Sequence, residues 1–170
     1  MPRVSFDALP DDARVWVFAS AQPVRGAAAD TLLEEVDRFL DDWKAHGAPL
    51  TNARDWRDEQ FLIIGVDERA AGASGCSIDG LFRIFKGLES AIGTSLLGSG
   101  RVFYRDRSGT VRSVTRDEFA GLAARGDVTQ GTPVFDTALT RLADLRERFE
   151  TEARRSWHAQ LAPELAGAER

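Results

Sequence analysis

The chain has 170 residues, of which 43% are hydrophobic and 29% charged, a composition typical of one globular domain. Its 27 acidic residues outnumber its 22 basic ones, so its net charge is −5 and a broad nucleic-acid interface is disfavoured. No apolar run reaches the roughly 20 residues of a membrane-spanning helix, and the first residues lack a signal-peptide pattern. These features favour a cytoplasmic protein whose partners are neither nucleic acid nor membrane.

Cys76 is the only cysteine of the chain. It therefore has no partner for a disulfide within the chain, and a cysteine-based zinc site cannot be assembled. A reducing compartment fits this usage best, and we expect no metal site.

The first predicted segment is an arm over residues 1–13, which contains Pro2 and Pro10 and shows no sustained period. The arm is expected to pack loosely or not at all. A single domain over residues 14–158 should follow it, because no repeat, linker or low-complexity tract divides this range. Residues 159–170, rich in Ala and Glu, are expected to fray.

A strand is predicted at Arg14–Ser20, where both alternating sets of side chains are apolar, as in a strand buried on both faces. From Asp30 to His46 apolar residues recur at three- and four-residue spacing, which predicts an amphipathic helix. Asp30 is the expected N-cap of this helix, and Gly47 the expected left-handed residue after its last turn.

A hairpin follows, with strands predicted at Leu50–Arg57 and Phe61–Val66 and a short polar connection between them. A small-residue loop then leads into a second amphipathic helix from Ser77 to Ile92, which Gly93 should end.

Another hairpin is predicted from Arg101–Arg105 and Thr110–Val114. Thr115 and Glu118 form a capping-box pattern, which places a short helix over residues 116–124. Val134 and Phe135 fit either a short strand or the first turn of a final helix. The apolar positions of that helix recur at helical spacing, at Leu139, Leu142, Leu145 and Phe149.

The order strand, helix, strand, strand, helix, strand indicates an α+β fold of the split βαβ, or ferredoxin-like, kind. We expect its antiparallel sheet to carry an added hairpin strand and two C-terminal helices. The crossover rules suggest that the first strand lies next to the third and parallel to it. In that case the loop at 21–26 and the loop at 71–76 lie side by side, and His46 lies at the far end of the sheet.

The loop between the third strand and the second helix is the one segment whose composition suggests chemistry. It contains Gly72, Ala73, Ser74 and Gly75, followed by Cys76 and Ser77. Backbone N–H groups of such a loop can converge on an anion, and the helix dipole adds to their attraction. Arg25, in the loop after the first strand, is expected to face this loop and hold an anionic group. A P-loop nucleotide site is disfavoured, because no Lys follows the last glycine.

Cys76 admits two interpretations. A thiol at a helix N-terminus has a lowered pKa, which would make Cys76 a nucleophile or a redox sensor. Cysteine is also among the most often buried residues and then acts as a small hydrophobe. Asp79, three residues later, is a candidate cap of the same helix end, although its charge opposes a thiolate.

The other polar candidates fit packing better than chemistry. His46 should end a helix far from Cys76 and act as a donor at the helix C-terminus. His158 follows Trp157 and is not excluded from a site. Asp67 and Glu68 could form an acid–base or metal pair, but adjacent strand residues point to opposite faces.

Four blocks resemble an uncharacterised bacterial protein family: the V-D-E of Val66–Glu68, the A-G-A-S-G-C-S-I-D of Ala71–Asp79, the W-x-x-H-G of Trp43–Gly47 and the S-W-H of Ser156–His158. The resemblance spans the chain from Trp16 to His158. Some members of this family carry the label "ABC transporter ATPase", but this chain lacks the phosphate-binding lysine that such an activity requires. The resemblance thus marks the glycine-rich loop without naming a function.

Two hypotheses remain open. The first is a domain that binds a small anionic ligand through Arg25 and the loop residues Gly72 to Ser77, with Cys76 as nucleophile. The second is a non-catalytic interaction or adaptor module, or a homo-oligomer, in which Cys76 is structural. Neither hypothesis indicates a cofactor, and the sequence leaves open whether the protein is an enzyme.

Overall fold

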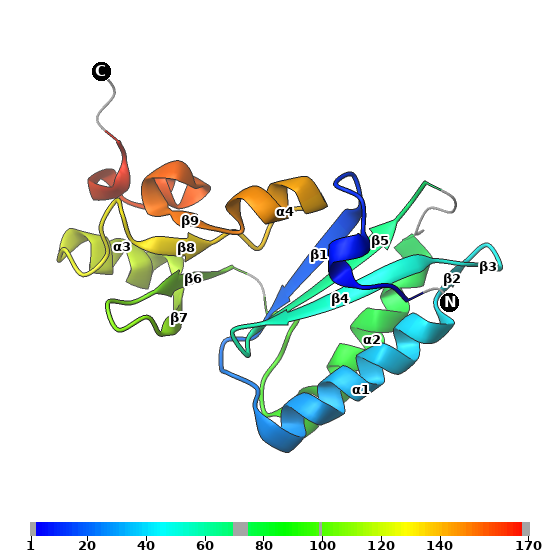
Figure 1. Cartoon of the computed structure of the whole chain (residues 1–170). Helices are drawn as coiled ribbons and strands as arrows, with labels where there is room; N and C mark the ends of the chain where they lie inside the picture. Colours follow the sequence, from blue (N-terminus) through cyan, green and yellow to red (C-terminus); the bar gives the residue numbers. More distant parts are fainter. Residues whose placement is uncertain (1–2, 70–74, 99, 168–170) are drawn as a thin grey trace. The chain divides into compact units, whose positions relative to one another are not determined.

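The computed structural model describes residues 3–69, 75–98 and 100–167, and the chain forms two compact units (Figure 1). The first unit comprises Met1–Gly98 with Ala138–Glu147, and the second comprises Ser99–Thr137 with Arg148–Arg170. Helices and antiparallel sheets occur together, so the predicted α+β class is confirmed. The single domain predicted over residues 14–158 stays a prediction, because two compact units of one chain can still unfold as one.

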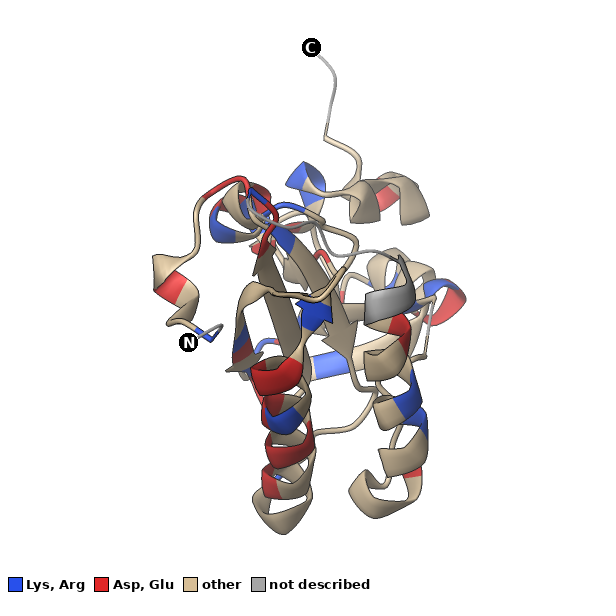
Figure 2. Cartoon of the chain, turned by 90° about the vertical axis from the view of Figure 1, so that its right-hand side faces the viewer, with Lys and Arg blue, Asp and Glu red and all other residues tan. Residues whose placement is uncertain are grey.

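The first unit is a three-stranded sheet with two long helices on one face (Figures 1 and 2). Its strand order is β1-β5-β4, and β5 is antiparallel to both neighbours. Side chains of the sheet and helices form a buried apolar core between the two layers, which includes Leu32, Leu40, Ile64 and Phe85. In chain order the elements are β1 (Arg14–Ala19), α1 (Gly26–Asp42), β2 (Lys44–Ala45), β3 (Ala48–Pro49), β4 (Thr51–Arg57), β5 (Phe61–Asp67) and α2 (Gly75–Ile92).

The direction of β1 corrects the sequence interpretation. β1 lies next to β5, as expected, but it is antiparallel to it, with Ala19 opposite Phe61 and Arg14 opposite Val66. The reason is topological: β4 and β5 form an antiparallel hairpin, and the α1 crossover makes β1 parallel to β4 instead. The carboxyl ends of β1 and β5 therefore lie at opposite ends of the sheet. The predicted neighbourhood of residues 21–26 with Gly75 and Cys76 is wrong, and residues 71–74 lie outside the described residues.

The end of α1 also differs from the prediction. The helix starts at Gly26 rather than after Asp30, and it ends at Asp42. His46, with a φ of 51°, and Gly47, with a φ of 80°, form the two-residue turn between β2 and β3 instead of a helix end. α1 and β5 finish at the same end of the sheet, and α2 begins there. His46 therefore lies at this end, and the prediction that it lies at the far end is wrong.

The N-terminal arm is packed, contrary to expectation. Leu9 and Ala13 are buried, and a methyl group of Leu9 lies directly over the Cα of Gly65 in β5. The segment that returns from the second unit lies along the outer edge of β1: the Val15 N–H donates to the Thr140 carbonyl, and Arg14 bridges Arg141. Two segments distant in sequence thus complete the first unit.

The second unit contains a four-stranded antiparallel sheet of order β7-β6-β8-β9. β6 pairs with β7 and β8, so the ferredoxin-like topology, in which this strand would lie beside β1, is not confirmed. The capping box of Thr115 and Glu118 is present and starts α3 at the predicted residue. Its elements are β6 (Arg101–Arg105), β7 (Val111–Thr115), α3 (Arg116–Ala124), β8 (Pro133–Phe135) and β9 (Glu150–Glu152), whereas α4 (Leu142–Arg148) belongs to the first unit up to Glu147.

The C-terminal part is more compact than predicted. Val134 and Phe135 belong to a strand, and the final helix stops at Arg148 because the chain enters β9. Short 3₁₀ turns follow up to Leu165, which is fully buried in the second unit. The expectation that the chain frays from residue 159 onward is therefore wrong as far as Leu165.

Candidate functional site

A cleft of about 410 Å³ lies at the carboxyl end of β5, beside the first residue of β1. Three segments of the first unit line it: the end of the N-terminal arm, the residue after β5, and the segment along the edge of β1. Its lining residues are Asp12, Arg14, Glu68, Thr140 and Arg141. The cleft therefore brings two guanidinium groups and two carboxylates together on one surface.

Arg14 is held in place by its surroundings. Its guanidinium carbon lies 4.6 Å from the ring centre of Trp16, two positions along the same strand face. Its Nη1 is 3.9 Å from Oε1 of Glu68, at the outer limit of an ion pair, and both side chains are partly exposed. Such an exposed pair contributes about 1 kcal/mol at most. A ligand can therefore take over part of the contact at little energetic cost.

Arg141 is fixed through its backbone, which bridges Arg14 at the start of β1. Within the described ranges, no carboxylate lies within 4.0 Å of its guanidinium group. The side chain is exposed and lines the cleft. It thus offers up to five N–H donors to a bound molecule.

Asp67 and Glu68 do not act as a pair. Asp67 is bound by both nitrogens of the Arg69 fork, and these hydrogen bonds from Arg69 lower the pKa of the Asp67 carboxyl. Glu68 instead lines the cleft beside Arg14. Among the residues whose placement is described, no group of three His, Cys, Asp or Glu could hold a metal ion.

The structure separates Arg25 from the residues it was expected to join. Arg25 precedes α1 and pairs with Glu59 in the turn between β4 and β5. That turn is at the end of the sheet opposite to the carboxyl end of β5. Arg25 thus does not face the carboxyl end of β5, from which the glycine-rich loop follows, because β1 and β5 run in opposite directions.

The other predicted residues fall on or near the start of α2. Gly72, Ala73 and Ser74 lie outside the described residues. Gly75, Cys76 and Ser77 have helical backbone in the first turn of α2, which begins two residues before the predicted start at Ser77 and keeps Cys76 at the helix N-terminus. Asp79 is exposed on the same helix.

His158 belongs to the core of the second unit. It is fully buried, stacks on Trp157 with ring centres 4.0 Å apart, and its Nδ1 lies 2.7 Å from the hydroxyl of Ser156. Burial, together with the nearby positive charge of Arg116, lowers its pKa to about 4. The S-W-H motif thus packs one turn of chain against α3, as the core interpretation of His158 expects.

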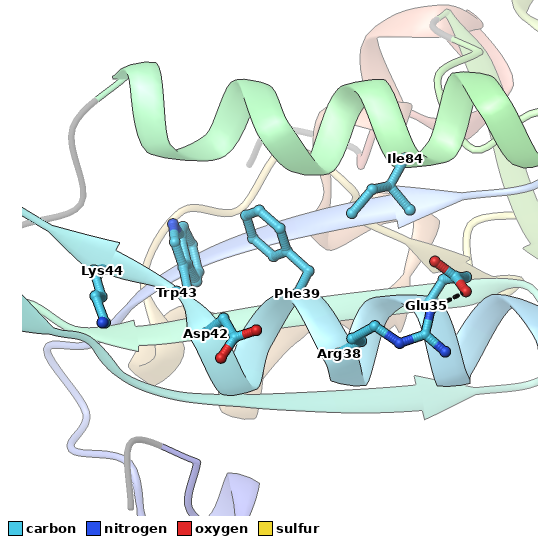
Figure 3. Close-up of a pocket in the computed structure, with 7 residues that line it drawn as sticks. All are labelled: Glu35, Arg38, Phe39, Asp42, Trp43, Lys44 and Ile84. Carbon is cyan, nitrogen blue, oxygen red and sulfur yellow. Dashed lines mark hydrogen bonds and ion pairs between the residues drawn. The ribbon is translucent and has the colours of Figure 1, made fainter.

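A second hollow of about 450 Å³ lies between α1 and α2 (Figure 3). The rings of Phe39 and Trp43 form its wall, with Ile84 of α2 opposite, and Arg38 is paired with Glu35. Acidic residues predominate along α1 (Figure 2). This hollow therefore suits an anion less well than the cleft at the end of β5. The sequence pattern gave no sign of it, since Phe39 and Trp43 have the spacing of ordinary core residues.

Compared with protein-family models, with curated proteins and with solved structures, the chain gives no match. The resemblance of the Ala71–Asp79 block to an uncharacterised family therefore stays a prediction. Among the described helices, none combines the length and the apolar character that crossing a membrane requires.

Proposed function

We propose that the cleft at the end of β5 binds a small anionic molecule, with Arg14 and Arg141 as its cationic contacts. The observation that carries this proposal is the convergence of the two arginines from segments 127 positions apart, with Arg141 lacking a carboxylate partner among the described residues. Arginine forks bind carboxylate and phosphate groups in a bidentate manner. A cleft of about 410 Å³ is within the range of small-molecule sites.

The start of α2 follows β5 in the chain, although no described residue of α2 lines the cleft. α2 begins seven positions after Glu68, and its first turn leaves backbone N–H groups without partners inside the helix. These groups and the helix dipole attract negative charge. Cys76, on this first turn, is the candidate nucleophile if the protein is an enzyme. Arg25 has no part in the revised site.

The test is a thermal-shift titration with phosphate, acetate and an acyl phosphate. A ligand at about 100 times its Kd stabilises the folded chain by about 2.7 kcal/mol, which raises the Tm by roughly 5–10 °C for a chain of this size. Arg141→Gln should weaken binding about tenfold or more, since a hydrogen bond to a charged group contributes about 1.5–3 kcal/mol.

Arg25→Gln is the matched control, because Arg25 is also exposed and also belongs to the first unit, but lies at the other end of the sheet. It should bind as tightly as the unmodified chain. Equal weakening by both substitutions would mean a general effect of net charge, and would refute the site.

The second hypothesis, an interaction module or homo-oligomer, is favoured by Phe82, whose ring on α2 is 37% exposed. Its ring packs edge-on against Phe18 of β1, and the exposed part offers an apolar contact for a second chain. Light scattering over a range of concentrations distinguishes the two: Phe82→Ser should lower the molar mass only if this surface joins chains.

A further inference from the structure

The cleft at the end of β5 carries balanced charge. Two guanidinium groups, of Arg14 and Arg141, are matched by two carboxylates, of Asp12 and Glu68. A pure anion bound by the arginines would lie close to both carboxylates, and like charges at such short range repel each other. The cleft is therefore not the all-cationic surface that a phosphate-specific site would present.

The carboxylates are available to a ligand. Glu68 makes only the long 3.9 Å contact with Arg14, and no ion pair of Asp12 occurs within the described part of the chain. Both are exposed, as is Thr140, whose hydroxyl can donate or accept a hydrogen bond. The lining thus offers hydrogen-bond donors and acceptors in one cleft.

Resting on the anion site proposed above, we propose that its ligand is a zwitterion: a small amino carboxylate that carries an ammonium group beside its carboxylate. The ligand carboxylate contacts the forks of Arg141 and Arg14, and the ligand ammonium group lies between Glu68 and Asp12. Each ligand charge then meets the opposite charge. Arg14 forms the link between the two halves, since it is within reach of Glu68 and lines the cleft.

This arrangement predicts an order of affinity among ligands. The ammonium group of an amino carboxylate is attracted by the two carboxylates of the cleft, whereas acetate is repelled by them and methylammonium is repelled by the arginines. Amino carboxylates should therefore bind at least about tenfold more tightly than either half alone, because a charge-assisted hydrogen bond is worth a factor of about ten or more.

The experiment is a titration of the full chain with glycine, β-alanine, 4-aminobutyrate, acetate, methylammonium and phosphate at constant ionic strength, followed by ligand-detected NMR. The same series with Arg141→Gln corrects for the non-specific stabilisation that amino acids cause at high concentration. We expect one of the three amino carboxylates to bind at least about tenfold more tightly than acetate, methylammonium or phosphate.

Glu68→Gln distinguishes this inference from the anion site itself. This substitution should weaken binding of the preferred amino carboxylate about tenfold and strengthen binding of acetate. Glu59→Gln, at the opposite end of the sheet, should change neither affinity. If acetate or phosphate binds as tightly as every amino carboxylate and Arg141→Gln weakens both, the zwitterion is refuted and the anion site stands. If no probe binds more tightly to the unmodified chain than to Arg141→Gln, both proposals are refuted.

Discussion

Gly80 of α2 lies against the ring of Phe39 in α1. A Cβ added to Gly80 would lie 2.8 Å from Cε2 of Phe39 in α1, nearer than carbon atoms can approach without displacement. The Phe39 ring has little freedom to move away, because it packs on Trp43 with ring centres 5.3 Å apart. We therefore predict that Gly80→Ala destabilises the protein.

Two effects of opposite sign determine the magnitude. Alanine is favoured over glycine in a helix interior by about 1 kcal/mol, whereas overpacking costs about 1–3 kcal/mol. The expected net loss in the free energy of unfolding is thus about 1 kcal/mol. Gly87→Ala is the matched control on the same helix, where an added Cβ meets nothing within 4 Å. It should raise the stability by about 1 kcal/mol.

Urea unfolding followed by circular dichroism measures both variants, and the expected difference between them is about 2 kcal/mol. In a Phe39→Leu background, Gly80→Ala should raise the free energy of unfolding, because the smaller leucine side chain leaves room for the added methyl group. A Gly80→Ala variant as stable as Gly87→Ala would refute the close approach of the two helices at this point.

Three further predictions concern the second unit and Cys76. The folded-state pKa of His158, about 4, is below its unfolded value of 6.5, so the unfolded chain takes up the proton first as the pH falls. The free energy of unfolding should therefore decrease by about 3 kcal/mol between pH 6.5 and pH 4. In His158→Gln the urea midpoint should no longer decrease with pH in this way. Thr115→Ala should cost about 1 kcal/mol in unfolding free energy by removing the N-cap of α3, whereas Glu118→Gln, which keeps the capping box, should cost less. Cys76 in the native chain should react with iodoacetamide faster than in the denatured chain near neutral pH, and a native thiol that resists up to pH 9 would make it a buried structural residue.

Elements with local signals were predicted to within a few residues. The capping box marked the first residue of α3, and the continuous apolar run from Phe61 to Val66 gave β5 to within one residue. α1 was misplaced at both ends for local reasons. It starts in Gly26–Ala29, which carry no apolar period and no side-chain cap, and Trp43 continues the helical spacing although its backbone is extended.

The site was only partly predictable, because the direction of β1 decides which loops meet. Spacing along the chain does not encode this direction, and a reversed β1 exchanges Arg25 for Arg14 as the arginine near the end of β5. Arg141 had no local signal at all. It reaches the cleft because its segment pairs with the edge of β1, a contact between residues 127 positions apart that no short pattern records.

The return of Ala138–Glu147 to the first unit has a consequence for fragment work. The chain passes between the units at 98/99, 137/138 and 147/148, so neither unit is a continuous stretch of sequence. A fragment ending at Gly98 would leave the Val15 N–H and the Ala13 carbonyl without their hydrogen-bond partners. Limited proteolysis or split expression should therefore fail to yield a stable first unit, whereas a recombinant that joins residues 138–147 to residue 98 through a flexible linker can restore it.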